Sequence, residues 1–134
     1  MRVVVIWLAS LALAICNGAL REFVLVPRFG TNVAHVMSCF SLSALILLLT
    51  FATIPWLRPA NGLRAIEIGT AWTAMTLVFE FGFGRLRGAE WSVLFADYDL
   101  LNGRLWILVL ATTFLAPFVA ARTRGLFDAP GANA

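Results

Sequence analysis

The 134-residue chain contains no lysine, a single histidine and two cysteines. Its basic side chains are all arginines, and they are scattered instead of forming the basic run that a nucleic-acid patch requires. His35 has no second histidine beside it, and Cys16 and Cys39 show neither a CxxC motif nor metal-ligand spacing. No nucleophile stands beside a base. We therefore expect no enzymatic activity, cofactor, metal or nucleic-acid partner.

Hydrophobic residues are abundant instead, at 61% of the chain, and the mean hydropathy is +0.90. Ordinary soluble domains are roughly half apolar. Three stretches are almost purely apolar, and a fourth is apolar apart from Glu67 and Glu80 near its ends. Each is near the roughly 20 residues that a helix needs to cross a bilayer. They cover residues 3–20, 33–57, 66–84 and 105–121. The sequence predicts one integral membrane domain over residues 1–134, an all-α bundle of four transmembrane helices.

The longest connection lies between the third and fourth spans. Its bulky side chains recur at helical spacing, with acidic residues off that face: Trp91, Leu94, Phe95, Tyr98 and Leu101. This pattern predicts a short amphipathic helix in the membrane interface. Four side chains are expected to anchor the chain at headgroup depth: Trp56, Trp91, Tyr98 and Trp106. Residues 122–134 are small and polar, and we expect this tail to be disordered.

The arginines do not decide the orientation, because each side of the expected four-span arrangement carries the same number of them. Dual topology therefore stays open. The acidic long connection is similar to a translocated loop, and the arginines near the termini have fewer acids beside them. We expect both termini in the cytoplasm, with the chain in a bacterial inner membrane.

Successive spans cross the membrane in opposite directions. The first and third spans therefore end on the membrane side where the second and fourth spans begin, and polar residues gather on that side. This set contains Asn17, Arg21, His35, Glu80 and Arg104. Glu80 lies about 6 Å inside the end of its span at the helical rise. A carboxylate at that depth needs a partner. We expect a group from another span to satisfy Glu80, with Arg21 and Arg104 as the leading candidates and His35 nearby.

A stripe of small and polar residues follows one face of the third span: Gly69, Thr73, Thr76, Glu80 and Gly84. Such stripes pack membrane helices together, and two functional interpretations stay open. The first is passage of a small ion or solute along Thr73, Thr76 and Glu80, with further polar groups from the first and second spans, in a homo-oligomer. The alternative is an accessory or assembly subunit that packs the same stripes against a partner membrane protein.

Two resemblances accompany these patterns. Phe79-Glu80-Phe81-Gly82-Phe83-Gly84, Trp91-Ser92, Asp97-Tyr98 and Gly103-Arg104-Leu105-Trp106 resemble a pattern in small uncharacterised four-span bacterial inner-membrane proteins, which implies no activity. Gly30-Thr31, Ser38-Cys39-Phe40, and Thr73, Thr76 and Glu80 are similar to positions in small fluoride channels, dual-topology dimers of four-span subunits. The chain departs from that family at three positions, which hold His35, Ala74 and Leu77, and in its long third connection.

Overall fold

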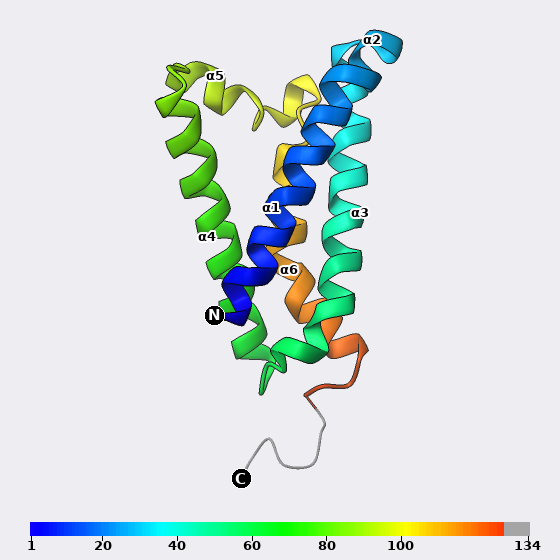
Figure 1. The fold of residues 1–134 in the computed structure, drawn as a ribbon, viewed down its shortest axis with the longest axis vertical. Helices are drawn as coiled ribbons and strands as arrows, with labels where there is room; N and C mark the ends of the chain where they lie inside the picture. Colours follow the sequence, from blue (N-terminus) through cyan, green and yellow to red (C-terminus); the bar gives the residue numbers. More distant parts are fainter. Residues whose placement is uncertain (128–134) are drawn as a thin grey trace.

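The computed structural model describes residues 1–127, and this part of the chain is helical, with no strand (Figure 1). The helices are α1 (Arg2–Leu20), α2 (Val26–Phe29), α3 (Thr31–Leu57), α4 (Gly62–Leu86), α5 (Trp91–Ala96) and α6 (Trp106–Thr123). A π-helical turn, Arg21–Leu25, joins α1 to α2, and a 3-10 turn, Leu100–Asn102, precedes α6. The all-α prediction is confirmed for these residues.

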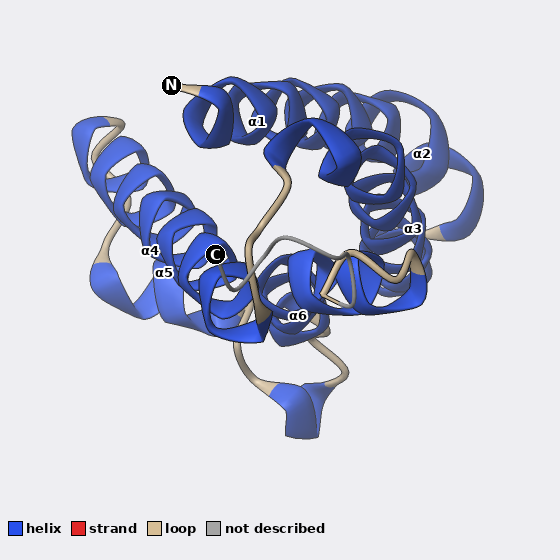
Figure 2. Ribbon diagram, turned by 90° about the horizontal axis from the view of Figure 1, so that it is seen from below, coloured by secondary structure: helices blue, strands red, loops and turns tan. Residues whose placement is uncertain are grey.

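The four long helices stand around the bundle in the order α1, α3, α6, α4 (Figure 2). The last long helix, α6, packs along both α3 and α4 and separates them, although α3 and α4 are consecutive in the chain. On the remaining side, α1 meets α4 only near its own N-terminus, where Trp72 donates its indole N–H to the Val3 carbonyl at 2.9 Å. Above that crossing the two helices diverge (Figure 1).

Three helical segments within residues 1–127 are long and apolar enough to cross a membrane. They are Arg2–Phe29, Thr31–Leu57 and Trp106–Thr123. These segments support a membrane protein. Helix α4 has 25 residues but carries Glu67 and Glu80, and it is not one of the three.

The first helical segment is longer than expected. It continues past Asn17 and Arg21, through the π-helical turn and α2, to Phe29. Pro27 lies in α2, shortly after the π-helical turn, and as a proline it donates no backbone hydrogen bond to the preceding turn of this continuous helix. The chain reverses at Gly30, whose φ of +78° is a conformation open to glycine. The sequence predicted that the segment with Pro27 and Gly30 connects the first two spans. In the structure only Gly30 interrupts the helix.

The connection after α4 folds back onto that helix. The Phe81 ring lies 6.1, 5.3 and 5.8 Å, centroid to centroid, from the rings of Trp91, Phe95 and Tyr98. The helical spacing of the connection thus brings its aromatic side chains to one side, where they contact α4. Helix α5 itself is short, ending at Ala96.

The chain stays packed beyond α6. Leu126 and Phe127 pack against a buried cluster that includes Ile54 and Ala120, and the Phe127 ring lies 5.8 Å from the Phe118 ring. The tail that the sequence predicted to be disordered from residue 122 is therefore structured to Phe127. The rest of that prediction concerns residues 128–134, which lie outside the described residues.

Candidate functional site

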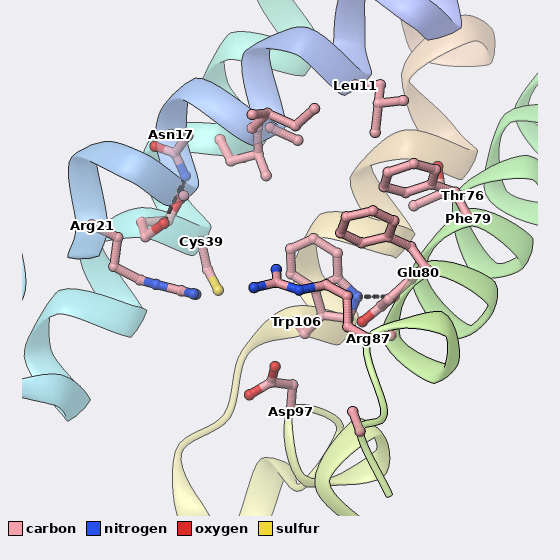
Figure 3. A pocket seen from close by; sticks show the side chains of 18 residues that line it. Leu11, Asn17, Arg21, Cys39, Thr76, Phe79, Glu80, Arg87, Asp97 and Trp106 are labelled. Carbon is pink, nitrogen blue, oxygen red and sulfur yellow. Dashed lines mark hydrogen bonds between the residues drawn. The ribbon is translucent and has the colours of Figure 1, made fainter. Parts of the chain in front are cut away.

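A cavity of about 410 Å³ lies between α1 and α4. Its lining residues on these two helices come from the second half of each, which is the upper half in Figure 1. Helices α1, α3 and α4, the start of α6 and the connection after α4 supply its walls. Much of the lining is apolar, including Leu11, Leu42, Phe79 and Phe83. The charged groups gather toward one end (Figure 3). The cavity is therefore amphipathic, with an apolar slot leading to a polar end.

The lower end of the cavity is closed by the crossing of α1 and α4. The indole N–H of Trp7 donates to the Thr76 hydroxyl at 3.1 Å, and the Trp7 ring meets the Phe79 ring edge to face at 6.5 Å. Trp72, just below, is 1% exposed. The lining begins above this point, at Leu11 on α1 and Thr76 on α4. The cavity consequently reaches only part of the way along the bundle.

Glu80 is bound by two aromatic side chains instead of an arginine. The Tyr98 hydroxyl and the Trp106 indole N–H each donate to the same carboxylate oxygen, Oε2, at 2.8 Å (Figure 3 shows the Trp106 bond). These two hydrogen bonds offset the cost of removing the carboxylate from water. An arginine partner would add the cost of removing its own charge from water. Tyr98 and Trp106 were expected only as interfacial anchors. The sequence did contain a signal for this second role, because the polar atom of a partly buried Tyr or Trp needs a hydrogen-bond partner.

The group from another span that was expected beside Glu80 is Trp106 of α6, and within residues 1–127 neither Arg21 nor Arg104 forms an ion pair with Glu80. The Nε of Arg21 lies 3.1 Å from an oxygen of Glu22, and Nη1 of Arg104 lies 3.4 Å from Asp97. Both acids are closer along the chain than Glu80 is. The number of spans predicts that Glu80, Arg21 and Arg104 lie at one end of the bundle. It does not predict which hydrogen-bond donors the folded connection brings to the Glu80 carboxylate.

Asn17 and His35 hold helices together. The side-chain amide of Asn17 donates to the hydroxyl of Ser38 at 2.6 Å and accepts from the Ser41 hydroxyl at 2.8 Å, which joins α1 to α3. The Nε2 of His35 accepts the backbone N–H of Leu105 at 3.2 Å, so the neutral ring carries its proton on Nδ1. His35 thereby fixes the start of α6 against α3, and interhelical polar contacts of this kind are typical of membrane bundles.

The expected polar path is only partly present. Asn17, Arg21, Thr76 and Glu80 line the cavity, whereas His35, Thr73 and Arg104 are not part of its lining. The hydroxyls of Thr73 and Thr76 donate to carbonyls four residues earlier in their own helix. Sequence reasoning missed the charged lining residues Arg87 and Asp97, because charges in a connection usually have only solvent as a partner.

Tyr98 provides a test of the Glu80 contact, since it is the only tyrosine. Burial, the hydrogen bond to Glu80 and the nearby negative charge raise the pKa of the Tyr98 phenol above its usual range. We expect ultraviolet difference absorbance to detect no phenolate in the folded protein at about pH 10, where free tyrosine is half ionised. The contact stabilises the fold fully below that pH, and the stabilisation is lost as pH rises toward the folded pKa.

The control for this titration is Glu80→Gln, which removes the negative charge and keeps an acceptor oxygen. It should lower the Tyr98 pKa part of the way toward the free value while the fold is retained. Ionisation of Tyr98 at the free-tyrosine pH in the unaltered folded protein would contradict the contact.

Within residues 1–127, no three His, Cys, Asp or Glu side chains come together as a potential metal site. The chain has no match among models of known protein families, curated proteins or solved structures.

Proposed function

We propose that this chain is a four-span membrane protein that binds a small amphipathic molecule in the cavity between α1 and α4. The observation that carries the proposal is the cavity itself, about 410 Å³ in volume, a size typical of ligand sites. Its apolar lining suits a hydrocarbon group, and its polar end, with Glu80 and Arg21, suits a headgroup. Binding requires no catalytic group, so the proposed activity is not enzymatic.

The fourth span of this proposal is α4. The helix has 25 residues and packs against α6, which is itself long and apolar enough to cross a membrane. Its two carboxylates have partners, since Glu67 lies 2.7 Å from Arg64 and Glu80 accepts the bonds described above. A bacterial inner membrane with cytoplasmic termini, and Trp91 and Tyr98 at headgroup depth, complete the proposed topology.

Cysteine labelling tests the topology. In a background without Cys16 and Cys39, we expect Asn61→Cys and Ser92→Cys to react with a membrane-impermeant maleimide from opposite membrane faces. The reason is that α4 runs between the two positions. A uniformly inserted sample in which both positions react from one face would contradict the fourth span.

A cavity-filling substitution tests the binding. Gly18 lines the cavity, and a Cβ at this position meets no heavy atom within 4 Å, so Gly18→Phe places a ring there without a backbone clash. We expect this variant to lose at least about tenfold in affinity for a neutral single-chain amphiphile such as monoolein, measured by the shift in thermal unfolding with ligand concentration.

The matched control is Gly82→Phe. Gly82 also has open space at its Cβ position, but it is not part of the cavity lining. Its affinity for monoolein should equal that of the unaltered chain. Equal affinities for the Gly18 variant, the Gly82 variant and the unaltered chain would contradict binding in the cavity.

Passage of a small ion or solute is the second candidate function, and it uses the same cavity as an entrance. Thr76 and Glu80 favour it, because both lie in the lining above the crossing of α1 and α4. Trp7→Ala removes the ring that closes this crossing. Liposome flux that rises in this variant, and not in Trp56→Ala, would support passage, because Trp56 lies at the end of α3 and outside the cavity lining.

An accessory or assembly subunit in contact with other membrane helices is the remaining alternative. In the described residues, Gly69 of the third-span stripe contacts α6, and Asn17 of the first span contacts α3. These contacts support packing within the chain more directly than packing against a partner.

A further inference from the structure

Two arginines face each other across the polar end of the cavity. Arg21 lies in the π-helical turn after α1, and Arg87 directly follows α4. Figure 3 shows both side chains extended toward one another, from opposite sides of the cavity that they line. Like charges that face each other repel, and an anion between them converts this repulsion into two attractions. The arrangement suits a bound anionic group.

The acidic groups in the lining are already engaged. Glu80 accepts from Tyr98 and Trp106, and Asp97 lies 3.4 Å from Arg104, which is not part of the lining. Both carboxylates therefore have partners within the chain in the absence of a ligand.

The arginines are less fully engaged. Arg21 shares only its Nε with Glu22, in a pair whose side chains are 30% and 58% exposed, and exposed pairs of this kind contribute little. Arg87 forms no ion pair within residues 1–127, and its guanidinium lies 5.5 Å from the centre of the Phe83 ring. Both arginines therefore keep guanidinium N–H groups that can donate to an anionic ligand, whereas Glu80 and Asp97 already have partners.

We infer that the cavity binds an acidic phospholipid, with its phosphate between Arg21 and Arg87 and part of an acyl chain against Leu11, Phe79 and Phe83. This inference rests on the proposed function and names the ligand class. Guanidinium groups bind phosphate oxygens through paired, charge-assisted hydrogen bonds.

The apolar walls of the cavity favour a lipid over a soluble phosphate as the ligand. Apolar residues continue from the two arginines into the slot, and Figure 2 shows no further helix covering the side between α1 and α4. In a bilayer that side faces lipid. A soluble phosphate would use the arginines alone and leave the apolar slot without a ligand group.

The test uses the full chain in a neutral detergent, with short-chain phosphatidylglycerol and diacylglycerol of identical acyl chains as probes. We expect phosphatidylglycerol to bind at least about tenfold more tightly, the minimum for a charge-assisted contact of this class. Arg21→Gln and Arg87→Gln should each remove about tenfold in phosphatidylglycerol affinity and leave diacylglycerol affinity unchanged, because diacylglycerol has no phosphate. Arg28→Gln is the control, since Arg28 lies at the same end in α2 but outside the lining.

Each alternative outcome has a distinct meaning. Equal affinity for the two lipids, with both lost in Gly18→Phe, overturns the anion site and leaves cavity binding intact. Binding of neither lipid nor monoolein overturns the proposed function as well. Glycerol phosphate that binds as tightly as phosphatidylglycerol overturns the lipid assignment in favour of a free anion. An Arg28→Gln loss equal to that of Arg21→Gln overturns the two-arginine site in favour of general surface charge.

Discussion

Gly69→Ala is expected to destabilise the bundle by about 2 kcal/mol or more, the range for forced overpacking of a close-packed interior. Gly69 stands where α4 meets α6, and a Cβ there would overlap the backbone carbonyl oxygen of Phe114 and come within 2.9 Å of its carbonyl carbon. Backbone cannot rotate away as a side chain can, so the two helices would have to separate. The free energy of unfolding in mixed micelles with a denaturing detergent measures the loss.

Gly82→Ala is the matched control because it makes the same change in the same helix. Its Cβ meets no heavy atom within 4 Å. Alanine is about 0.8–1.0 kcal/mol better than glycine inside a helix, so this variant should be unchanged or more stable. The two variants differ only in the space available. A loss for Gly69→Ala no larger than that for Gly82→Ala would show that α4 does not approach α6 as closely as the structure places it.

The sequence predicts the helices well because their signal is local. Apolar runs such as residues 33–57 and 105–121 correspond to α3 and α6 to within a few residues. The stripe on the third span was correct as a packing signal at Gly69, where only glycine permits the backbone contact with α6. These features follow from residue type and spacing alone, which the sequence contains in full.

The site was predicted less completely, because it depends on how the connection after α4 folds back. The acids and aromatics of that connection fall at helical spacing whether they face lipid, water or another helix. Only the folded chain brings Tyr98 to Glu80 and leaves Arg87 facing Arg21. The order of the helices was likewise not in the sequence, since α6 lies between two helices that are consecutive in the chain.

Glu80→Leu is expected to cost about 2 kcal/mol or more, because the Tyr98 hydroxyl and the Trp106 indole N–H would each lose their acceptor, at a cost of at least about 1 kcal/mol for each unsatisfied donor. Glu80→Gln should change the free energy of unfolding by less than about 1 kcal/mol, since its amide oxygen can accept both bonds that Oε2 accepts. The same detergent unfolding measurement applies.

Glu67→Leu is the control for loss of a carboxylate from α4. Glu67 and its partner Arg64 have side chains 48% and 66% exposed, so losing this pair should cost less than about 1 kcal/mol. Equal losses for Glu67→Leu and Glu80→Leu would contradict the two hydrogen bonds to Glu80. Glu80→Gln then distinguishes a structural role of Glu80 from a role in ion passage. Unchanged stability with altered ion flux, or with an altered pH dependence of flux, would show that passage uses the charge of the carboxylate. Flux that stays in proportion to the amount of folded protein would leave Glu80 as the acceptor that holds the connection over the cavity.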